Sequence, residues 1–375
     1  MIKIKEVKNK KDLRRFIDFP HDLYVNDLNY VPELFIAQRD MLTKGKHPSL
    51  NHVEFQLFLA ESSDSKVVGR IAAIHNLNHN KFANDANGFF GFFDCIDNYG
   101  VAEELFNAAK NWVNNKGLSG LLGPVNYSTN DPCGLLINGF EHLPQIMMTY
   151  NKSYYQSIFE RYGFQKKMDL FSYWFTPDTI PERTIKLAKN IEQRLSRNGI
   201  TIRKINLKKF KEEVKGIKKI YNEAWDKNWG FVPFTDDEFN YVAKDMKLIL
   251  DKDLVLVAEK NNQMIGFTLA LPNINEVQRD VKRGRLFPTG ILKLLFNKSK
   301  IKSIRVLTLG VLNDFRMLGI EACFYTKITE EAVKKGYVGA DASWILESNE
   351  MMNRELKNIG SNVYKVHRLY QLQIR

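Results

Sequence analysis

The chain has 375 residues, with 44% hydrophobic and 12% aromatic side chains and a formal net charge of +12. This size and composition predict two or more domains with sizeable cores, and the charge favours an anionic partner or a lysine-rich solvated surface. Its three cysteines (Cys95, Cys133, Cys323) lack disulfide-like or metal-like spacing, and no apolar run reaches bilayer-spanning length. These features exclude a disulfide framework, a cysteine metal cluster and a transmembrane helix.

The N-terminal segment MIKIKEVKNKKDLRRF is charged and has no apolar core, so we expect no signal peptide and a cytoplasmic protein. The first half then predicts a sheet with two helices. We expect strands at 2–7, 55–61, 66–75, 88–95, 120–125 and 164–174, and helices at 101–116 and 153–162.

A turn and a helix over 177–198 precede the second half, whose elements follow a similar order. We expect strands at 200–205, 254–259, 264–271, 304–311, 339–345 and 363–374, and helices at 207–225, 236–250, 320–335 and 349–359. A basic, partly helical insertion covers 275–302. The matched order predicts a duplicated mixed-sheet α/β fold, with domains at 1–175 and 199–375 and a linker helix between them, at 176–198.

The most informative stretch is RVLTLGVLNDFRMLGIEACFYTKITEEAVKKG, residues 305–336. A buried strand leads through a polar turn with Arg316 and Gly319 into a helix that begins at about Ile320. Free backbone N–H groups at a helix start attract anions, and glycine lets a ligand approach the backbone closely. The pattern therefore predicts an anion-binding turn.

This strand, Arg-x-x-Gly turn and helix resemble the acyl-CoA pyrophosphate loop of the GNAT superfamily of N-acyltransferases, and the order of elements in the second half resembles the whole GNAT fold. The resemblance implies that Arg316, Gly319 and Ile320 hold donor phosphate and that the backbone of Leu309 and Val311 lines the pantetheine. Acyl-CoA is then the co-substrate, and no metal is expected.

Two departures from the family pattern stand in the loops. Glu321 occupies the position of the family's second small residue, and the first half has Asp97 where the family has Arg or Gln, followed by Gly100 and Ala102. A carboxylate about 5 Å from a phosphate costs roughly 3 kcal/mol at an effective dielectric of about 20. A glutamate in the first helical turn is, however, favourable when no anion binds there. The second half keeps the cation and is the better donor site.

Catalysis of amine acylation needs a proton acceptor and often an acid for the leaving thiolate. The family's usual tyrosine is absent, because Leu356 and Phe159 stand at its two positions. We therefore predict Glu347, at the end of a strand, as the base and Tyr364 as the next candidate. Asn349 is either a substrate ligand or, with Ser348, a helix cap.

Further polar residues gather at strand ends and in the long insertion 126–151, where function and simple turn formation are both open. We predict that seven residues contact the substrate: Asn126, Asn130, Asn151, Tyr154, Trp344, Asn349 and Arg368. The acceptor would be a small-molecule or lipid-like amine in the cleft between the halves.

The segment 282–298 combines basic and apolar residues and predicts either a lid helix or peripheral membrane contact. No recognised nucleic-acid module is present, so we expect no sequence-specific nucleic-acid binding. The leading hypothesis is an acyl-CoA-dependent N-acyltransferase. The alternatives are a catalytically inactive ligand-binding or scaffold protein of the same fold, and a transferase with an aminoacyl-tRNA donor, as in the architecturally similar peptidoglycan-bridge enzymes.

Overall fold

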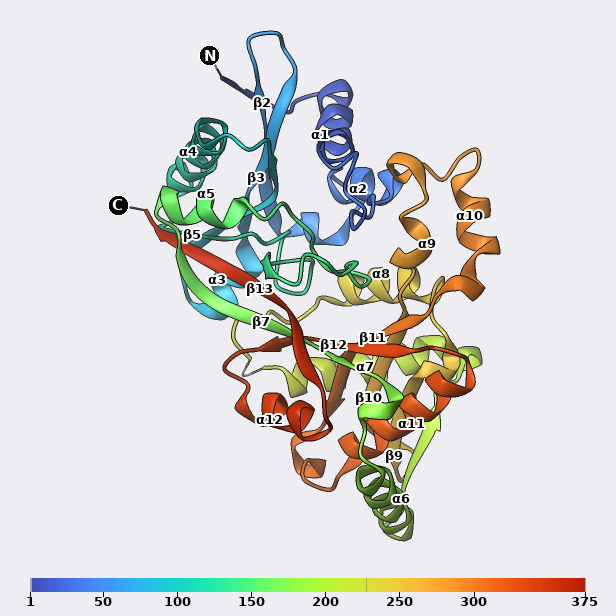
Figure 1. Cartoon of the computed structure of the whole chain (residues 1–375). Coiled ribbons are helices and arrows are strands. Elements are labelled where there is room, and N and C mark those ends of the chain that lie inside the picture. The colour runs from blue at the N-terminus through green and yellow to red at the C-terminus, as the bar shows by residue number, and fades with distance from the viewer. Residues whose placement is uncertain (1, 227, 375) are drawn as a thin grey trace. The chain divides into compact units, whose positions relative to one another are not determined.

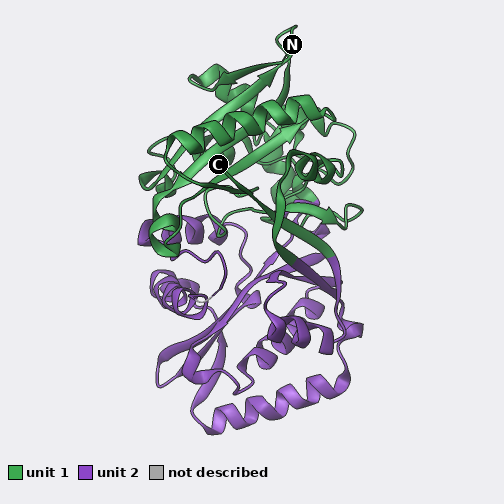
Figure 2. Cartoon of the chain, turned by 90° about the vertical axis from the view of Figure 1, so that its left-hand side faces the viewer, with its two compact units in different colours: residues 1–170, 277–297, 365–375 green, residues 171–276, 298–364 purple. Residues whose placement is uncertain are grey.

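The computed structural model describes residues 2–226 and 228–374, and the chain forms two compact units (Figure 2). Unit 1 contains residues 1–170, 277–297 and 365–375, and unit 2 contains residues 171–276 and 298–364. Each unit therefore draws on non-contiguous segments, whereas the sequence suggested contiguous halves. The domain boundaries at 175 and 199 stay a prediction.

Unit 1 is built on a sheet with the strand order β1-β2-β3-β4-β5-β13 (Figure 1). Its strands are β1 (Lys3–Glu6), β2 (Val53–Glu61), β3 (Val67–Asn76), β4 (Asn87–Cys95), β5 (Gly120–Gly123), the short β6 (Leu135–Asn138) and parts of β7 (Gln165–Phe175) and β13 (Asn362–Gln373). Its helices are α1 (Lys10–Leu23), α2 (Phe35–Met41), α3 (Leu77–Ala83), α4 (Tyr99–Asn115), α5 (Tyr155–Tyr162) and α10 (Gly290–Phe296).

Unit 2 repeats this plan with the strand order β7-β12-β11-β10-β9-β8. Its strands are β8 (Ile200–Lys204), β9 (Val255–Lys260), β10 (Gln263–Pro272), β11 (Ser303–Val311) and β12 (Gly339–Leu346), besides its share of β7 and β13. Its main helices are α6 (Glu182–Arg197), α7 (Phe210–Ala224), α8 (Asp236–Lys247), α11 (Ile320–Lys334) and α12 (Glu350–Asn358). The predicted mixed-sheet α/β class is confirmed.

The last strands of the two halves are exchanged. In unit 1, Tyr370–Gln373 of β13 pair antiparallel with Gly123–Gly120 of β5, in the place that a self-contained first half would give to its own last strand, β7. In unit 2, β7 lies beside β12. β7 and β13 are the equivalent last strands of the two halves, so each can take the other's place at the sheet edge. The hydrogen-bonded pairing is kept, and only the partner strand changes.

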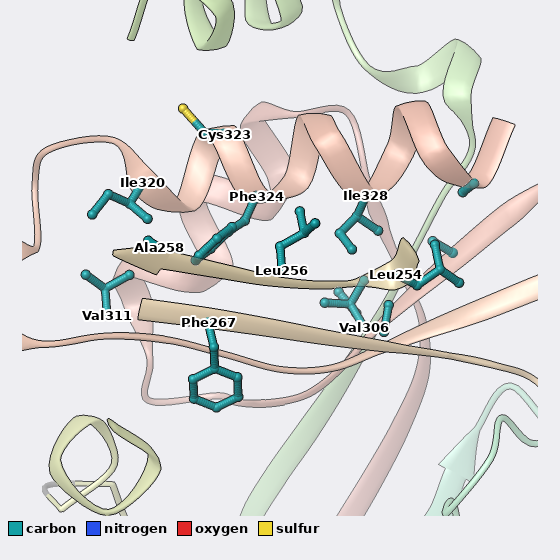
Figure 3. Packing of buried hydrophobic residues seen from close by; sticks show 14 of the residues in the cluster. Leu254, Leu256, Ala258, Phe267, Val306, Val311, Ile320, Cys323, Phe324 and Ile328 are labelled. Carbon is teal, nitrogen blue, oxygen red and sulfur yellow. The ribbon is translucent and has the colours of Figure 1, made fainter. Parts of the chain in front are cut away.

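Each unit has its own hydrophobic core. In unit 2 one face of the sheet packs against α11, with Leu256, Phe324 and Ile328 among the buried residues (Figure 3). In unit 1 α4 packs in the same way on its sheet, and Phe90, Phe106 and Phe159 form an aromatic cluster there. Both helices follow a strand directly, and so each core fixes the turn between that strand and its helix.

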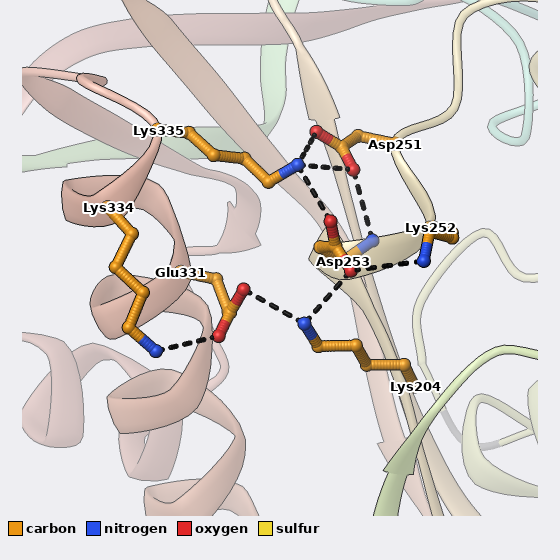
Figure 4. Close-up of polar contacts among 7 residues, drawn as sticks. All are labelled: Lys204, Asp251, Lys252, Asp253, Glu331, Lys334 and Lys335. Atoms are coloured by element: carbon orange, nitrogen blue, oxygen red, sulfur yellow. Dashed lines mark hydrogen bonds and ion pairs between the residues drawn. The ribbon is translucent and has the colours of Figure 1, made fainter.

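The far end of α11 is held by an ionic network (Figure 4). Lys204 Nζ lies 2.9 Å from Asp253 and 3.0 Å from Glu331, and Lys335 Nζ lies 2.8 Å from both Asp251 and Asp253. These contacts join the C-terminal end of the helix to β8 and to the turn before β9. The opposite end of α11, which carries the glycine turn, is thereby oriented as well.

Some elements were not predicted. No element was assigned to the first-half segments that form α1, α2, α3 and β6. In α1, Asn9 caps the first turn, and Phe16, Ile17 and Phe19 are buried although Pro20 lies inside the helix. The basic insertion, expected as part of the second half, places its residues 277–297 in unit 1.

Candidate functional site

The parallel strands β11 and β12 separate within unit 2. They pair only from Ser303–Val306 to Gly339–Ala342, although β11 continues to Val311 and β12 to Leu346. The other edge of β11 stays paired with β10 along almost its whole length. Leu309 and Val311 therefore lie in a part of β11 whose second edge is not paired with β12. The buried hydroxyl of Thr308, also in this part, has no hydrogen-bond partner among the residues the structure describes.

A polar cluster lies where the two strands begin to separate. Arg305 and Asp341 face each other in the strand register, one residue before the last pair, and both are almost fully buried. Arg305 Nε donates to Ser343 Oγ at 3.0 Å, and the Ser343 hydroxyl bonds Asp341 Oδ1. The Tyr364 hydroxyl donates to Asp341 Oδ2 at 2.6 Å. The cluster thus connects a half-buried phenol to a buried carboxylate.

Two tryptophans flank this cluster. The Arg305 guanidinium lies 5.1 Å from the centroid of Trp344, and the rings of Trp174 and Tyr364 lie 5.6 Å apart. The sequence analysis predicted Tyr364 and Trp344 but missed Arg305, Asp341 and Ser343. The sequence signal for them was a charged residue inside each of two otherwise apolar strands. A charge in a buried strand needs a polar or charged partner, so two such residues indicate a buried polar cluster.

The glycine turn follows β11 directly. Gly319 caps α11 with φ +86°, and Met317 also has a positive φ. Gly319 has no side chain with which to cap the helix, and the Glu321 carboxylate accepts a hydrogen bond from its own backbone N–H in the first turn of α11. Arg316 Nη2 donates to the carbonyl of Ala224 at 3.0 Å and its Nε to that of Val311 at 3.3 Å. The predicted phosphate ligand therefore also holds the turn.

Acidic side chains line the start of the same helix. Burial raises the pKa of Glu321, against the opposing effects of a hydrogen bond with its own backbone and of nearby Arg316. Burial also raises the pKa of Glu355 on α12, and the charge of Glu321 raises it further. The glycine and the separated strands fit an acyl-CoA donor, whereas the two carboxylates oppose its phosphates.

Glu347 and Asn349 follow the end of β12. Asn349 caps α12 by accepting from Met352 N at 3.2 Å, so the predicted capping alternative is confirmed. Asn353 Nδ2 donates to the carbonyls of Leu346 and Glu347 and fixes this corner. Six residues separate Glu347 from Asp341, a rise of roughly 20 Å along a strand. Glu347, just beyond the end of β12, is therefore far along the strand from Asp341, the carboxylate that Tyr364 contacts.

In unit 1 the corresponding strands are β4 and β5, which pair only at Asn87–Phe89 and Gly120–Leu122 although β4 continues to Cys95. Beyond this paired part, side chains of the same unit bond to the backbone of β4. Asn126 Oδ1 accepts from Phe92 N at 2.9 Å. Cys95 N donates to the hydroxyl of Tyr155 at 2.8 Å, and the Tyr154 hydroxyl donates to Cys95 O at 2.7 Å. Asn98 caps α4 by accepting from Val101 N. The chain itself thus occupies these backbone groups of unit 1, and the preference for unit 2 as the donor site stays a prediction.

The other predicted substrate ligands of unit 1 also make intramolecular contacts. Asn151 brackets the backbone of Leu136, with its Oδ1 2.7 Å from Leu136 N and its Nδ2 3.1 Å from Leu136 O. Arg368 forms a two-pronged ion pair with Asp169 at 2.8 and 3.0 Å. Asn130 N donates to Ser128 Oγ at 3.1 Å within the turn. Substrate roles for these residues stay predictions.

A groove of about 590 Å³ lies on the flank of α7, against α8. Its floor is apolar, with Phe210, Val214 and Phe239, and five lysines surround it: Lys211, Lys215, Lys218, Lys244 and Lys247. Lys218 pairs with Asp236 at 2.5 Å. This chemistry suits an apolar chain with an anionic end, and it repels the protonated amine of an acceptor.

Comparison with solved structures identifies the fold. A tandem GNAT protein from the clavulanic acid biosynthesis pathway matches with a TM-score of 0.59 and 8% identity, covering 100% of this chain and 98% of that one. A GCN5-related N-acetyltransferase from Sphaerobacter thermophilus matches with a TM-score of 0.54 and 12% identity, covering 100% and 96%. Protein family models give no match. The fold, with its separated strands and glycine turn, is that of a tandem GNAT protein, as the sequence predicted.

Two related sequences then place the chain more narrowly. Protein YghO of Escherichia coli is 36% identical over 98% of this chain and 94% of its own length. The bacterial ceramide synthase of Caulobacter vibrioides is 35% identical over 97% of this chain and 96% of its own length. The chain belongs to the family that contains these two proteins.

Proposed function

We propose that the protein is an N-acyltransferase that joins a long-chain acyl group to the amine of a lipid-like acceptor, with acyl-CoA as donor. The observation that carries the proposal is the separation of β11 and β12 above the buried Arg305–Asp341–Tyr364 cluster. The full-length relative named ceramide synthase supports a long-chain acyl group, because a ceramide is the amide of a fatty acid and a long-chain amino alcohol.

The donor would be held by unit 2. The backbone of Leu309 and Val311 and the unpartnered Thr308 hydroxyl offer polar contacts for the amide-rich pantetheine arm. The N–H groups at Gly319 and Ile320, with Arg316 beside them, would take the phosphates. Bound in this way, the thioester supplies an activated acyl carbon for attack by an amine.

The direction of the donor follows from the order of these elements. The phosphate turn comes just after Val311, so a donor along β11 would point its thioester toward Val306, roughly 16 Å deeper. Tyr364 and Asp341 lie at this deep end, whereas Glu347 lies at the outer end of β12. The geometry therefore favours Tyr364 as the group at the reacting atoms, and the base role of Glu347 stays a prediction.

In the proposed reaction, the amine nitrogen bonds to the acyl carbon and the carbon–sulfur bond breaks. The Tyr364 oxygen takes the proton that the amine loses, and its own proton passes to Asp341 across their 2.6 Å hydrogen bond. The Tyr364 hydroxyl then gives a proton to the departing thiolate, which leaves as the free thiol of CoA, and Asp341 returns its proton to Tyr364. Arg305 balances the charge of Asp341 while that carboxylate is ionised.

The test combines the purified protein with palmitoyl-CoA and sphinganine and detects the amide by mass spectrometry. Acetyl-CoA and the water-soluble amine glucosamine serve as matched donor and acceptor controls. We expect amide from the long-chain pair alone. Formation of amide from acetyl-CoA and glucosamine instead would contradict the lipid assignment, and no amide from any pair would contradict acyl transfer from CoA.

A ligand-binding protein without catalysis is the second candidate. The two carboxylates at the donor turn, Glu321 and Glu355, favour it because they oppose a phosphate anion. Both candidates should show higher thermal stability when palmitoyl-CoA or free CoA is added. A protein that binds neither ligand should show no such increase. A ligand at a hundred times its Kd raises the free energy of unfolding by about 2.7 kcal/mol.

A further inference from the structure

One face of unit 1 exposes large apolar side chains in a regular pattern. In α10, Leu292, Leu295 and Phe296 are 49%, 55% and 79% exposed, and Phe287 just before the helix is 76% exposed. The helical positions follow the i, i+3, i+4 rule, so they form one stripe. We name Phe287 with this stripe the α10 face.

The α10 face is mounted firmly on its own unit. Arg283 Nη1 lies 2.5 Å from Asp22 Oδ1, and Arg285 Nη2 lies 2.8 Å from Asp18 Oδ1, both in α1. The Arg285 guanidinium also lies 3.4 Å above the ring of Phe35. These contacts anchor the base of the insertion, so the stripe is presented on a braced support.

Close packing reinforces this support. Gly284 has φ +62°, and a Cβ at this position would collide with the carbonyl oxygen of Glu33. Gln278 Nε2 donates to Pro32 O at 3.0 Å, and Gly290 at the start of α10 is buried. The inner side of the insertion is thus fitted to the segment after α1, which leaves the outer stripe without a packing role inside the unit.

Further apolar residues lie near the same anchor points. Val25 and Leu28 follow α1 within a few residues of Asp22, and they are 73% and 81% exposed. Ile36, next to Phe35, is 46% exposed. Several large apolar residues thus stay in contact with water beside the anchored insertion, more than single scattered residues would give.

The charge of the insertion selects the partner. Residues 277–297 contain five basic residues (Arg279, Lys282, Arg283, Arg285, Lys293) and one acidic residue (Asp280), a net charge of +4. Arg283 and Arg285 are neutralised by carboxylates of α1. Lys293 Nζ instead donates to the backbone carbonyl of Asp280, which carries no charge. Aromatic and aliphatic side chains beside cations are typical of segments that lie in the interface of an anionic bilayer.

We propose that the α10 face docks the protein on the surface of a bilayer that contains anionic phospholipids. Phe287, Leu295 and Phe296 enter the boundary between headgroups and acyl chains, and the lysines contact the headgroups. Docking deepens the proposed function, because a lipid-like amine and a long acyl chain would both reside in that bilayer. The docking itself does not require turnover.

The test is sedimentation with sucrose-loaded vesicles of phosphatidylcholine, with or without roughly 30% phosphatidylglycerol. We expect binding to the anionic vesicles that weakens as salt rises from about 50 to about 500 mM. The double variant Leu295→Gln/Phe296→Gln should bind the anionic vesicles at least roughly tenfold more weakly than the unchanged protein. Leu248→Gln, which changes a 75% exposed leucine in unit 2, is the matched control and should bind like the unchanged protein.

Three outcomes would overturn the proposal. They are absence of wild-type binding to both vesicle types, equal binding of the double variant, and a wild-type dimer that the double variant converts to a monomer. The last outcome would assign the α10 face to a second copy of the chain. A Phe287→Trp variant adds a second reading: with anionic vesicles its emission should shift to shorter wavelength by more than that of the unchanged protein, which has five tryptophans. Amide formation in detergent micelles, measured separately, reports on the proposed function alone.

Discussion

The substitution Tyr364→Phe removes one oxygen atom and tests the proposed chemistry most directly. That hydroxyl donates to Asp341 Oδ2 at 2.6 Å, and Asp341 is fully buried. A hydrogen bond to a charged group contributes about 1.5–3 kcal/mol. Ser343 and Arg305 remain beside the carboxylate, so we expect the lower part of this range, about 1.5–2 kcal/mol of unfolding free energy.

The expected loss of turnover is much larger than this stability effect. A positioned acid–base group contributes roughly 10²–10⁴-fold. We therefore expect turnover on palmitoyl-CoA and sphinganine to fall by that factor, with donor affinity little changed. Release of CoA thiol can be followed with a thiol-reactive dye, because all three cysteines of the protein are buried thiols and add little background.

Tyr162→Phe is the matched control. Its hydroxyl donates to Asn107 Oδ1 at 2.7 Å in unit 1, so the substitution also removes one tyrosine hydrogen bond to a side-chain oxygen. It should lower stability slightly and keep turnover. Full turnover of Tyr364→Phe, together with a loss of roughly 10²–10⁴-fold in Glu347→Gln, would refute the deep position of the thioester. The base role first assigned to Glu347 would then be supported.

Three further predictions concern charge and topology. Glu321→Ala should tighten CoA binding by up to about a hundredfold at low salt and by less at high salt, in a titration; weaker binding would mean that Glu321 meets a cation. Hydrogen bonds from Lys335 and Lys204 lower the pKa of Asp253 to about 2, so its contribution of about 2 kcal/mol is present above the unfolded pKa of 3.8 and is lost as the pH falls toward 2. In urea unfolding, Asp253→Asn should therefore be less stable than the unchanged protein at neutral pH and equal to it near pH 2. A stability difference between the two proteins that stays the same at all pH values would show that ionisation of Asp253 is not its source. Deletion of residues 365–375 should make unit 1 sensitive to protease, whereas Val363→Ser, at an exposed position of the same strand, should not.

Local patterns predicted most of the elements. A turn and a helix were predicted over 177–198, and α6 (Glu182–Arg197) lies within this range. The segment with α1 was missed, since Pro20 interrupts the pattern that a helix would show. Asn349 was predicted as a possible cap from its place before the last helix, and it is one.

The site depended on contacts that no local pattern contains. Arg305, Asp341 and Tyr364 come from three strands that are distant in sequence, and only the register of β11 with β12 brings the first two opposite each other. The exchange of β7 and β13 was equally invisible, because both strands fit either edge by composition. Glu321 shows the reverse case, since its place in the first turn after Gly319 can be read from the local sequence. Its effect on a bound phosphate stays a prediction.

The exchanged strand has a consequence for synthesis on the ribosome. Residues 1–170 make most of unit 1, yet the edge of β5 is covered only by Tyr370–Gln373. At about 5–20 residues per second, the 194 residues between position 170 and position 365 take roughly 10–40 s to translate. During this interval the nascent chain carries an unpaired β5 edge, which can join a neighbouring nascent chain. The exchange thus makes the synthesis of residues 370–373, rather than the emergence of the first half, the event that completes this edge of unit 1.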